Sequence, residues 1–208
     1  MAHKGERKTR SARPERIPKL GRYVIVTDTD ETEKNYFEGL KANLPEASRN
    51  QLEIVVRKCT TQELVKKACE EMLRAPKYAQ IVIVFDRDDV RNFDTIIRDA
   101  EKQDIFVGWS NPCFEIWMHA YFGEMPPSDV SKTCIAKFSR SFMERSGGEY
   151  AKSDKRIYEK LTRYGNEETA IKIAKNRYQS YKGTAKPSEM NPCTAVWQIV
   201  EEIKNKSE

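Results

Sequence analysis

Short apolar runs alternate with segments of helical periodicity over residues 23–109. Four runs are rich in Val and Ile, which favours buried strands, and they cover residues 23–26, 52–56, 80–85 and 105–109. The segments between them place apolar side chains on one helical face, at residues 33–44, 62–73 and 90–102. Strands that alternate with helices form parallel sheets with right-handed crossovers, so the pattern predicts an α/β fold with a three-layer core.

The pattern after residue 110 is helical throughout. Periodic apolar positions predict helices over residues 111–122, 130–145, 153–164, 167–182 and 191–205. Two of these segments begin with Asn-Pro, where Asn is a favourable N-cap and Pro suits the first helical position. The sequence therefore predicts residues 23–125 as an α/β core and residues 126–208 as a helical extension packed on it.

Composition places the chain among folded, soluble proteins. Its 208 residues include 38% hydrophobic and 10% aromatic residues, but no apolar stretch of membrane-spanning length and no signal peptide. Five Cys without a CxxC pair, together with two His, do not give the usual zinc spacing, which favours reduced thiols in the cytoplasm. Residues 1–22 lack apolar periodicity and contain two prolines, which predicts a disordered basic arm that either contacts nucleic acid or keeps the chain soluble.

The formal net charge of +5 is unevenly distributed along the chain. Residues 1–22 carry +6, residues 23–131 carry −7 and residues 132–208 carry +6. Basic segments suit a polyanion such as nucleic acid, whereas an acidic centre suits bound cations.

Carboxylates follow three of the four predicted strands. Asp28 and Glu33 come after the first strand, Asp86 and Asp88 after the third, and Glu115 after the fourth. Ligands of open α/β sheets bind outside the carboxyl ends of the strands, so these side chains are expected to meet at one edge. Clustered carboxylates are unfavourable unless cations bind them, and hard oxygen ligands suit Mg²⁺ or Mn²⁺. We expect the carboxyl groups of Asp28, Asp86 and Asp88 to converge on a metal.

Several of these residues have a structural interpretation as well. Asp30 and Glu33 fit a capping box, Glu115 in a first helical turn would complement the macrodipole, and Asp89 would cap the helix after the third strand. His119, four residues after Glu115, is a candidate general base or a packed core side chain.

Other candidates have weaker support. Lys152 follows a Gly pair and is either a phosphate contact or a solvated Lys; Cys113 and Cys193, after Asn-Pro, are either thiols of lowered pKa or small residues at helix starts. No glycine loop for nucleotide phosphates and no GxSxG motif is present.

Four segments in this order resemble the RloB-like family of bacterial proteins associated with restriction and anti-phage defence. They are YVIVTDTDETEKNYFEGL, IVIVFDRDD, SNPCFEIWMHAYF and NPCTAVWQIV. The resemblance covers about residues 23–203 and implies a Toprim-like domain, the metal-binding fold of topoisomerases, primases and OLD-type nucleases.

The resemblance implies roles for individual residues. The acidic residue after the first strand, Glu followed by Gly in the family, falls on Asp28 and Thr29 here. The family's T-E pair matches Thr32 and Glu33, its D-x-D matches Asp86 and Asp88, and its N-P-x-F-E ends at Glu115. The family's His-Phe at the end of the following helix falls on Tyr121 and Phe122. Asp28, Asp86 and Asp88 are expected to bind metal, with Glu33 and Glu115 also catalytic, and the expected substrate-binding residues are Arg87, Asn111, His119 and Lys152.

The sequence thus supports two hypotheses. The first is a Mg²⁺- or Mn²⁺-dependent nuclease of anti-phage defence, with RNA such as transfer RNA favoured over DNA by analogy with related Toprim effectors. The second is a nucleic-acid-binding or partner-controlled module with weak catalysis, which the Asp28-Thr29 departure favours because a shorter carboxylate displaces any ligand it holds. The resemblance also implies an ABC- or SMC-type ATPase partner; a homo-oligomer is a further option, and no membrane contact is expected.

Overall fold

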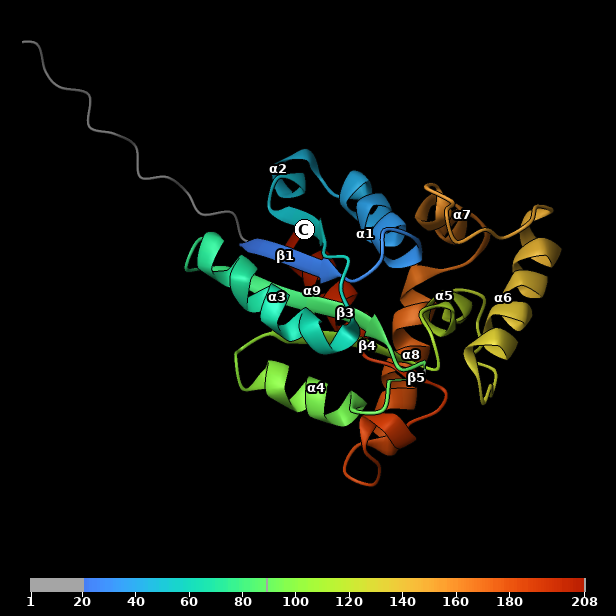
Figure 1. Cartoon of the computed structure of the whole chain (residues 1–208). Coiled ribbons are helices and arrows are strands. Elements are labelled where there is room, and N and C mark those ends of the chain that lie inside the picture. Colours follow the sequence, from blue (N-terminus) through green and yellow to red (C-terminus); the bar gives the residue numbers. More distant parts are fainter. Residues whose placement is uncertain (1–20, 89, 208) are drawn as a thin grey trace, which may run out of the picture.

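The computed structural model describes residues 21–88 and 90–207 (Figure 1). Almost all of the predicted basic arm, residues 1–20, lies outside the described residues, as does the predicted cap Asp89. The arm's last residue, Arg22, is the first residue of a strand.

A five-stranded sheet forms the centre of the protein, in the order β2-β1-β3-β4-β5 (Figure 1). Its strands are β1 (Arg22–Thr27), β2 (Leu52–Val56), β3 (Ala79–Asp86), β4 (Phe106–Asn111) and β5 (Cys193–Thr194). The first four are parallel, and β5 pairs antiparallel with β4. The four predicted strands and the α/β class are confirmed.

Helices cover both faces of the sheet. Successive side chains of a strand point to opposite faces, and because the strands are apolar at successive positions, both faces must be buried. Val24 and Ile83 belong to a core with α3 (Thr61–Arg74) and α4 (Phe93–Glu101). Tyr23 and Val82 belong to a second core with α1 (Thr32–Asn43), α5 (Glu115–Ala120) and α9 (Val196–Ser207). Figure 1 shows α3 and α4 on one side of the sheet and α9 on the other. The layers are therefore helix, sheet and helix.

The helices after α5 share the second core with the sheet. They are α6 (Ser131–Ser146), α7 (Ile157–Tyr164), α8 (Glu167–Tyr181) and α9, and a 3₁₀ turn at Pro187–Glu189 and a short α2 (Glu46–Arg49) complete the described elements. Apart from the two helices predicted at the Asn-Pro pairs, two more start later than expected: α4 begins at Phe93 with Asn92 as its N-cap, and α7 begins at Ile157.

The prediction that both Asn-Pro pairs open helices is wrong. Asn111 is the last residue of β4, and α5 starts only at Glu115. Asn191-Pro192 precedes β5, and α9 starts at Val196. Backbone pairing between β4 and β5 joins Ser110 to Thr194, so a long-range contact overrides the local capping preference.

Gly39 of α1 allows α7 to pack closely. A Cβ built at Gly39 would lie 2.5 Å from the Cβ of Tyr158. We expect Gly39→Ala to lower the free energy of unfolding by about 1–3 kcal/mol, because overpacking outweighs the better helix propensity of Ala. Urea unfolding measures this, with Gly148→Ala as the control, since the nearest atom to a Cβ there is 3.8 Å away. An unchanged midpoint for Gly39→Ala would contradict the close packing.

Candidate functional site

Carboxylates from α1 and from the ends of β1 and β3 line one cavity of about 140 Å³, here called the acidic cavity. Its acidic residues include Asp28, Glu33, Asp86 and Asp88, and Lys152 is its basic residue. Parallel pairing of β1 with β3 places the carboxyl ends of these strands side by side (Figure 1). The predicted meeting at one sheet edge therefore occurs for Asp28, Glu33, Asp86 and Asp88, whereas Glu115 does not line this cavity.

Asp86, the last residue of β3, has a buried carboxylate oxygen, Oδ1, for which the described residues supply no hydrogen-bond partner. Burial raises the pKa of Asp86 well above its ordinary value, and the charges of Glu33 and Glu115 raise it further. A backbone hydrogen bond from Phe114 acts in the opposite direction. Burial and neighbouring like charges thus both disfavour the ionised form of this side chain.

Glu33 lies in the first turn of α1 and is 7% exposed. The Thr29 hydroxyl donates a hydrogen bond of 3.1 Å to its Oε2. Burial raises the pKa of Glu33 to about 7, and the charges of Asp28 and Glu115 act in the same direction. The predicted capping box is wrong, because the N-cap is Glu31 and Asp30 instead forms an exposed ion pair of 3.3 Å with Lys58.

Glu115 is 1% exposed at the start of α5 and has two partners. The Tyr150 hydroxyl donates a 2.8 Å hydrogen bond to Oε1, and Lys152 Nζ lies 3.9 Å from the same oxygen. Burial lowers the pKa of Lys152, but the charges of Glu115, Asp86 and Glu33 raise it more, so the net direction is upward. Lys152 is therefore a cationic counter-charge to the acids.

Asp28 and Asp88, which also line the acidic cavity, are held by hydrogen bonds from other elements. Asp28 is half-buried, and its Oδ2 accepts a 3.3 Å hydrogen bond from Thr61 at the start of α3. Burial raises the pKa of Asp28. Asp88 is exposed and has a φ of +28°; its carboxylate accepts a hydrogen bond from Ser131, and its backbone N–H donates to Pro112 O at 3.1 Å. Contacts with α3 and α6 thus fix both side chains.

The donor chemistry of the acidic cavity suits Mg²⁺ or Mn²⁺, which prefer hard oxygen ligands. The buried Oδ1 of Asp86 is one such oxygen with its ligand capacity unused among the described residues. Within residues 21–88 and 90–207, no group of three or more His, Cys, Asp or Glu side chains is arranged so that it could hold a metal ion. Metal binding by Asp28, Asp86 and Asp88 therefore stays a prediction.

Three predicted substrate-binding residues lie outside the acidic cavity. Arg87 and Asn111 line a separate cavity that also includes Asp88. His119 is 1% exposed, its Nε2 lies 3.4 Å from Ser141 Oγ, and its ring packs edge-on against Phe122 and Phe138. Burial lowers the pKa of His119, so the neutral ring of a packed side chain is favoured.

Tyr150 is a site residue that the sequence interpretation missed, although it lies two positions before Lys152. Its hydroxyl bonds Glu115 and lies 3.2 Å from Thr32 Oγ1. We expect Tyr150→Phe to lower the free energy of unfolding by about 1–3 kcal/mol, because the buried Glu115 oxygen loses its donor. Thermal unfolding measures this, with Tyr78→Phe as the control, since Tyr78 is 61% exposed. Equal stability of the two variants would contradict this role of Tyr150.

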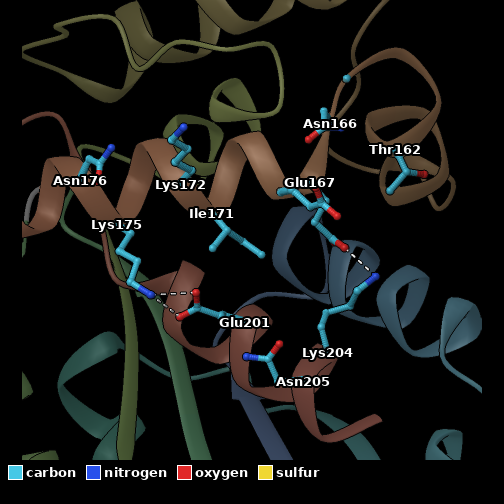
Figure 2. A pocket seen from close by; sticks show the side chains of 12 residues that line it. Thr162, Asn166, Glu167, Ile171, Lys172, Lys175, Asn176, Glu201, Lys204 and Asn205 are labelled. Atoms are coloured by element: carbon cyan, nitrogen blue, oxygen red, sulfur yellow. Dashed lines mark hydrogen bonds and ion pairs between the residues drawn. The ribbon is translucent and has the colours of Figure 1, made fainter. Parts of the chain in front are cut away.

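A larger cavity of about 730 Å³ lies between α8 and α9 (Figure 2). Its charged side chains are largely paired with one another: Lys175 with Glu201 at 2.9 Å, and Lys204 with Glu167 at 2.8 Å. Because these lysines already have acidic partners, the cavity lacks the concentration of like charge that distinguishes the acidic cavity.

The two cysteines considered as reactive thiols are buried, and neither starts a helix. A hydrogen bond with Cys134 and burial raise the pKa of Cys113, and burial raises that of Cys193 to about 12. Packing is thus the role that the structure supports for both.

The family model for RloB-like protein matches residues 23–203. The chain belongs to the RloB-like family. This match confirms the resemblance, and it includes every residue named for the acidic cavity. No curated protein and no solved structure matches this RloB-like chain. Among its described residues, no helix has the length and apolar character needed to cross a membrane.

Proposed function

We propose that this RloB-like chain is a Mg²⁺- or Mn²⁺-dependent nuclease that hydrolyses phosphodiester bonds in the acidic cavity. The observation that carries the proposal is the buried, unpartnered Oδ1 of Asp86 beside Glu33 and Glu115. Acids whose pKa values are raised by burial and by one another, in a cleft at the carboxyl edge of a sheet, are typical of a catalytic site.

Asp28, Asp86 and Asp88 would hold the cation. A bound divalent cation activates water and stabilises negative charge on the phosphate. Glu33, a buried acid in the first turn of α1 whose pKa burial raises, is the candidate proton carrier. Lys152, whose side chain is 45% exposed, is positioned by Glu115 to contact a phosphate oxygen.

RNA, such as transfer RNA, is the proposed substrate, and anti-phage defence is the proposed context, both from the family resemblance. The +6 charge of residues 132–208 supports a polyanionic substrate. An ABC- or SMC-type ATPase is the proposed partner on the same grounds.

A second candidate is a nucleic-acid-binding module with weak catalysis. Lys152 favours it, because an ammonium group 3.9 Å from Glu115 already supplies part of the positive charge that a metal would bring. The hydrogen bond from the Thr29 hydroxyl to Glu33 also favours this second candidate. The family has Gly at position 29, and Gly has no side chain that could bond the carboxylate.

Cleavage of end-labelled RNA and DNA with Mg²⁺ or Mn²⁺ tests the proposal. The nuclease hypothesis expects cleavage by wild type and none by Asp86→Ala/Asp88→Ala, with no cleavage in EDTA. Equal cleavage by both proteins excludes it. Binding of RNA without cleavage by wild type favours the second candidate.

A further inference from the structure

A second cavity, of about 560 Å³, adjoins the acidic cavity, and Asp88 lines both. We call it the flanking cavity; it lies between the ends of β3 and β4, the start of α6 and the segment before β5. Its lining includes Arg87, Pro112, Asp129, Val130, Lys132 and Asn191. Its size falls within the range of about 300–1,000 Å³ that small-molecule pockets occupy.

The lining of the flanking cavity combines charged, apolar and amide groups. Arg87 and Lys132 supply positive charge, and Asp88 and Asp129 supply negative charge. Pro112 and Val130 supply apolar surface, and Val130 is 56% exposed although it is a large apolar side chain. Asn191 supplies an amide. A nucleotide presents the matching set, namely an anionic phosphate, a flat ring face and a polar ring edge.

Arg87 is held in a fixed position. Its Nε donates to Ser188 O at 3.3 Å, and its Nη1 donates to Asp88 O at 3.0 Å. Asn111 contributes to the framework, since its amide donates to Pro187 O and Ser188 O, both at 3.2 Å. The segment that carries Asn191 is therefore tied to β3 and β4, and the cavity is preformed.

Asn191 provides the observation that points to a ligand. Its Oδ1 is buried, and the described residues supply no hydrogen-bond partner for it. Its backbone is fixed, because the Tyr181 hydroxyl donates to Asn191 O at 2.9 Å. A buried amide oxygen without a donor is unfavourable, and the N–H groups on the edge of a nucleobase are donors of the kind it lacks.

We propose that the flanking cavity binds one nucleotide of the substrate chain next to the phosphodiester that is cleaved, with Asn191 pairing to the edge of its base. This inference rests on the proposed nuclease function. Arg87 and Lys132 contact the phosphate on the far side of that nucleotide, while Asp88 marks the boundary with the acidic cavity. Asn191 is thus a base-binding residue, and the acidic cavity alone carries the cleavage chemistry.

Calorimetric titration in EDTA tests the flanking cavity independently of metal and of cleavage. The probes are AMP, ribose 5-phosphate and the RNA trinucleotide AAA. We expect AMP to bind roughly tenfold more tightly than ribose 5-phosphate, because only AMP satisfies the amide, and the trinucleotide to bind at least as tightly as AMP. Equal affinity for AMP and ribose 5-phosphate, or binding of AMP but not of the trinucleotide, would overturn the inference.

Variants assign the residues. Asn191→Leu should remove the difference between AMP and ribose 5-phosphate, and Asn191→Asp, which keeps the acceptor oxygen and the shape, should retain part of it. Lys132→Ala should weaken all three probes alike, whereas Lys66→Ala, at an exposed lysine of α3, should change none. An unaltered AMP preference in both Asn191 variants, or an effect of Lys66→Ala equal to that of Lys132→Ala, contradicts the assignment.

The outcomes separate the two proposals. Metal-dependent cleavage without binding of any probe at millimolar concentration overturns the flanking cavity and leaves the nuclease intact. Base-dependent binding of AMP and of the trinucleotide without cleavage by wild type retains the nucleotide site and rejects the nuclease.

Discussion

Asp86→Asn is expected to reduce metal-dependent cleavage at least about a hundredfold while making the metal-free protein more stable at pH 8. The two effects have one cause. Burial and the charges of Glu33 and Glu115 disfavour an ionised Asp86, and an amide of the same shape removes that charge. The same charge is what attracts a cation, so the substitution lowers the affinity for metal while it raises the stability of the metal-free protein.

Thermal unfolding with and without Mg²⁺ separates these effects. Mg²⁺ should raise the Tm of wild type by mass action and should raise that of Asp86→Asn much less. Asp99→Asn, at a half-exposed acid of α4, serves as the control and should behave as wild type. A Tm rise with Mg²⁺ that is the same in all three proteins would show that Asp86 does not hold the ion.

Glu33→Gln is expected to stabilise the metal-free protein at pH 8 by up to about 3 kcal/mol and to flatten its pH dependence. The folded-state pKa of Glu33 is about 7, against an ordinary value of 4.5. Between these values the folded protein binds more protons than the unfolded chain, so its stability falls as pH rises. The loss is complete above pH 7 and corresponds to about 1.4 kcal/mol per pKa unit.

Urea unfolding at pH 4.5, 6, 7 and 8 measures this effect in the difference between wild type and variant. The charge of Glu33 also raises the pKa of Asp86, so the difference reports the protonation of Glu33 together with this coupling. Glu38→Gln, an exposed acid of the same helix, provides the control and should track wild type at every pH. A constant difference from pH 4.5 to 8 would mean that Glu33 is not protonated on folding.

Local pattern was sufficient for most of the sheet. The unbroken run IVIVF of β3 and its alternation with helices predicted both the parallel sheet and the two-sided core, because burial on both faces requires continuous apolar residues. The two-residue β5 could not be predicted. Cys193 and Thr194 carry no strand signal, and they form a strand only because β4 offers an edge more than 80 residues away in sequence.

The acids of the candidate site were also visible in the sequence, because the carboxyl ends of parallel strands lie on one edge of a sheet. Asp28, Asp86 and Asp88 follow directly from that rule, and they do line one cavity. Tertiary structure alone decided their surroundings. Tyr150 and Lys152 reach Glu115 from a loop after α6, and His119 packs among aromatic rings outside the acidic cavity.

The sequence by itself therefore determined the class of fold, the family and the edge of the sheet that carries the acids. These depend on short-range hydrophobic periodicity, on short motifs and on the order of strands and helices along the chain, all of which can be read from the sequence. Only the tertiary structure decided which acids are buried, which polar atoms lack partners, and that the flanking cavity with Asn191 adjoins the acidic one. Burial and hydrogen bonding are set by segments distant in sequence, and they govern the pKa values and the binding chemistry of the site.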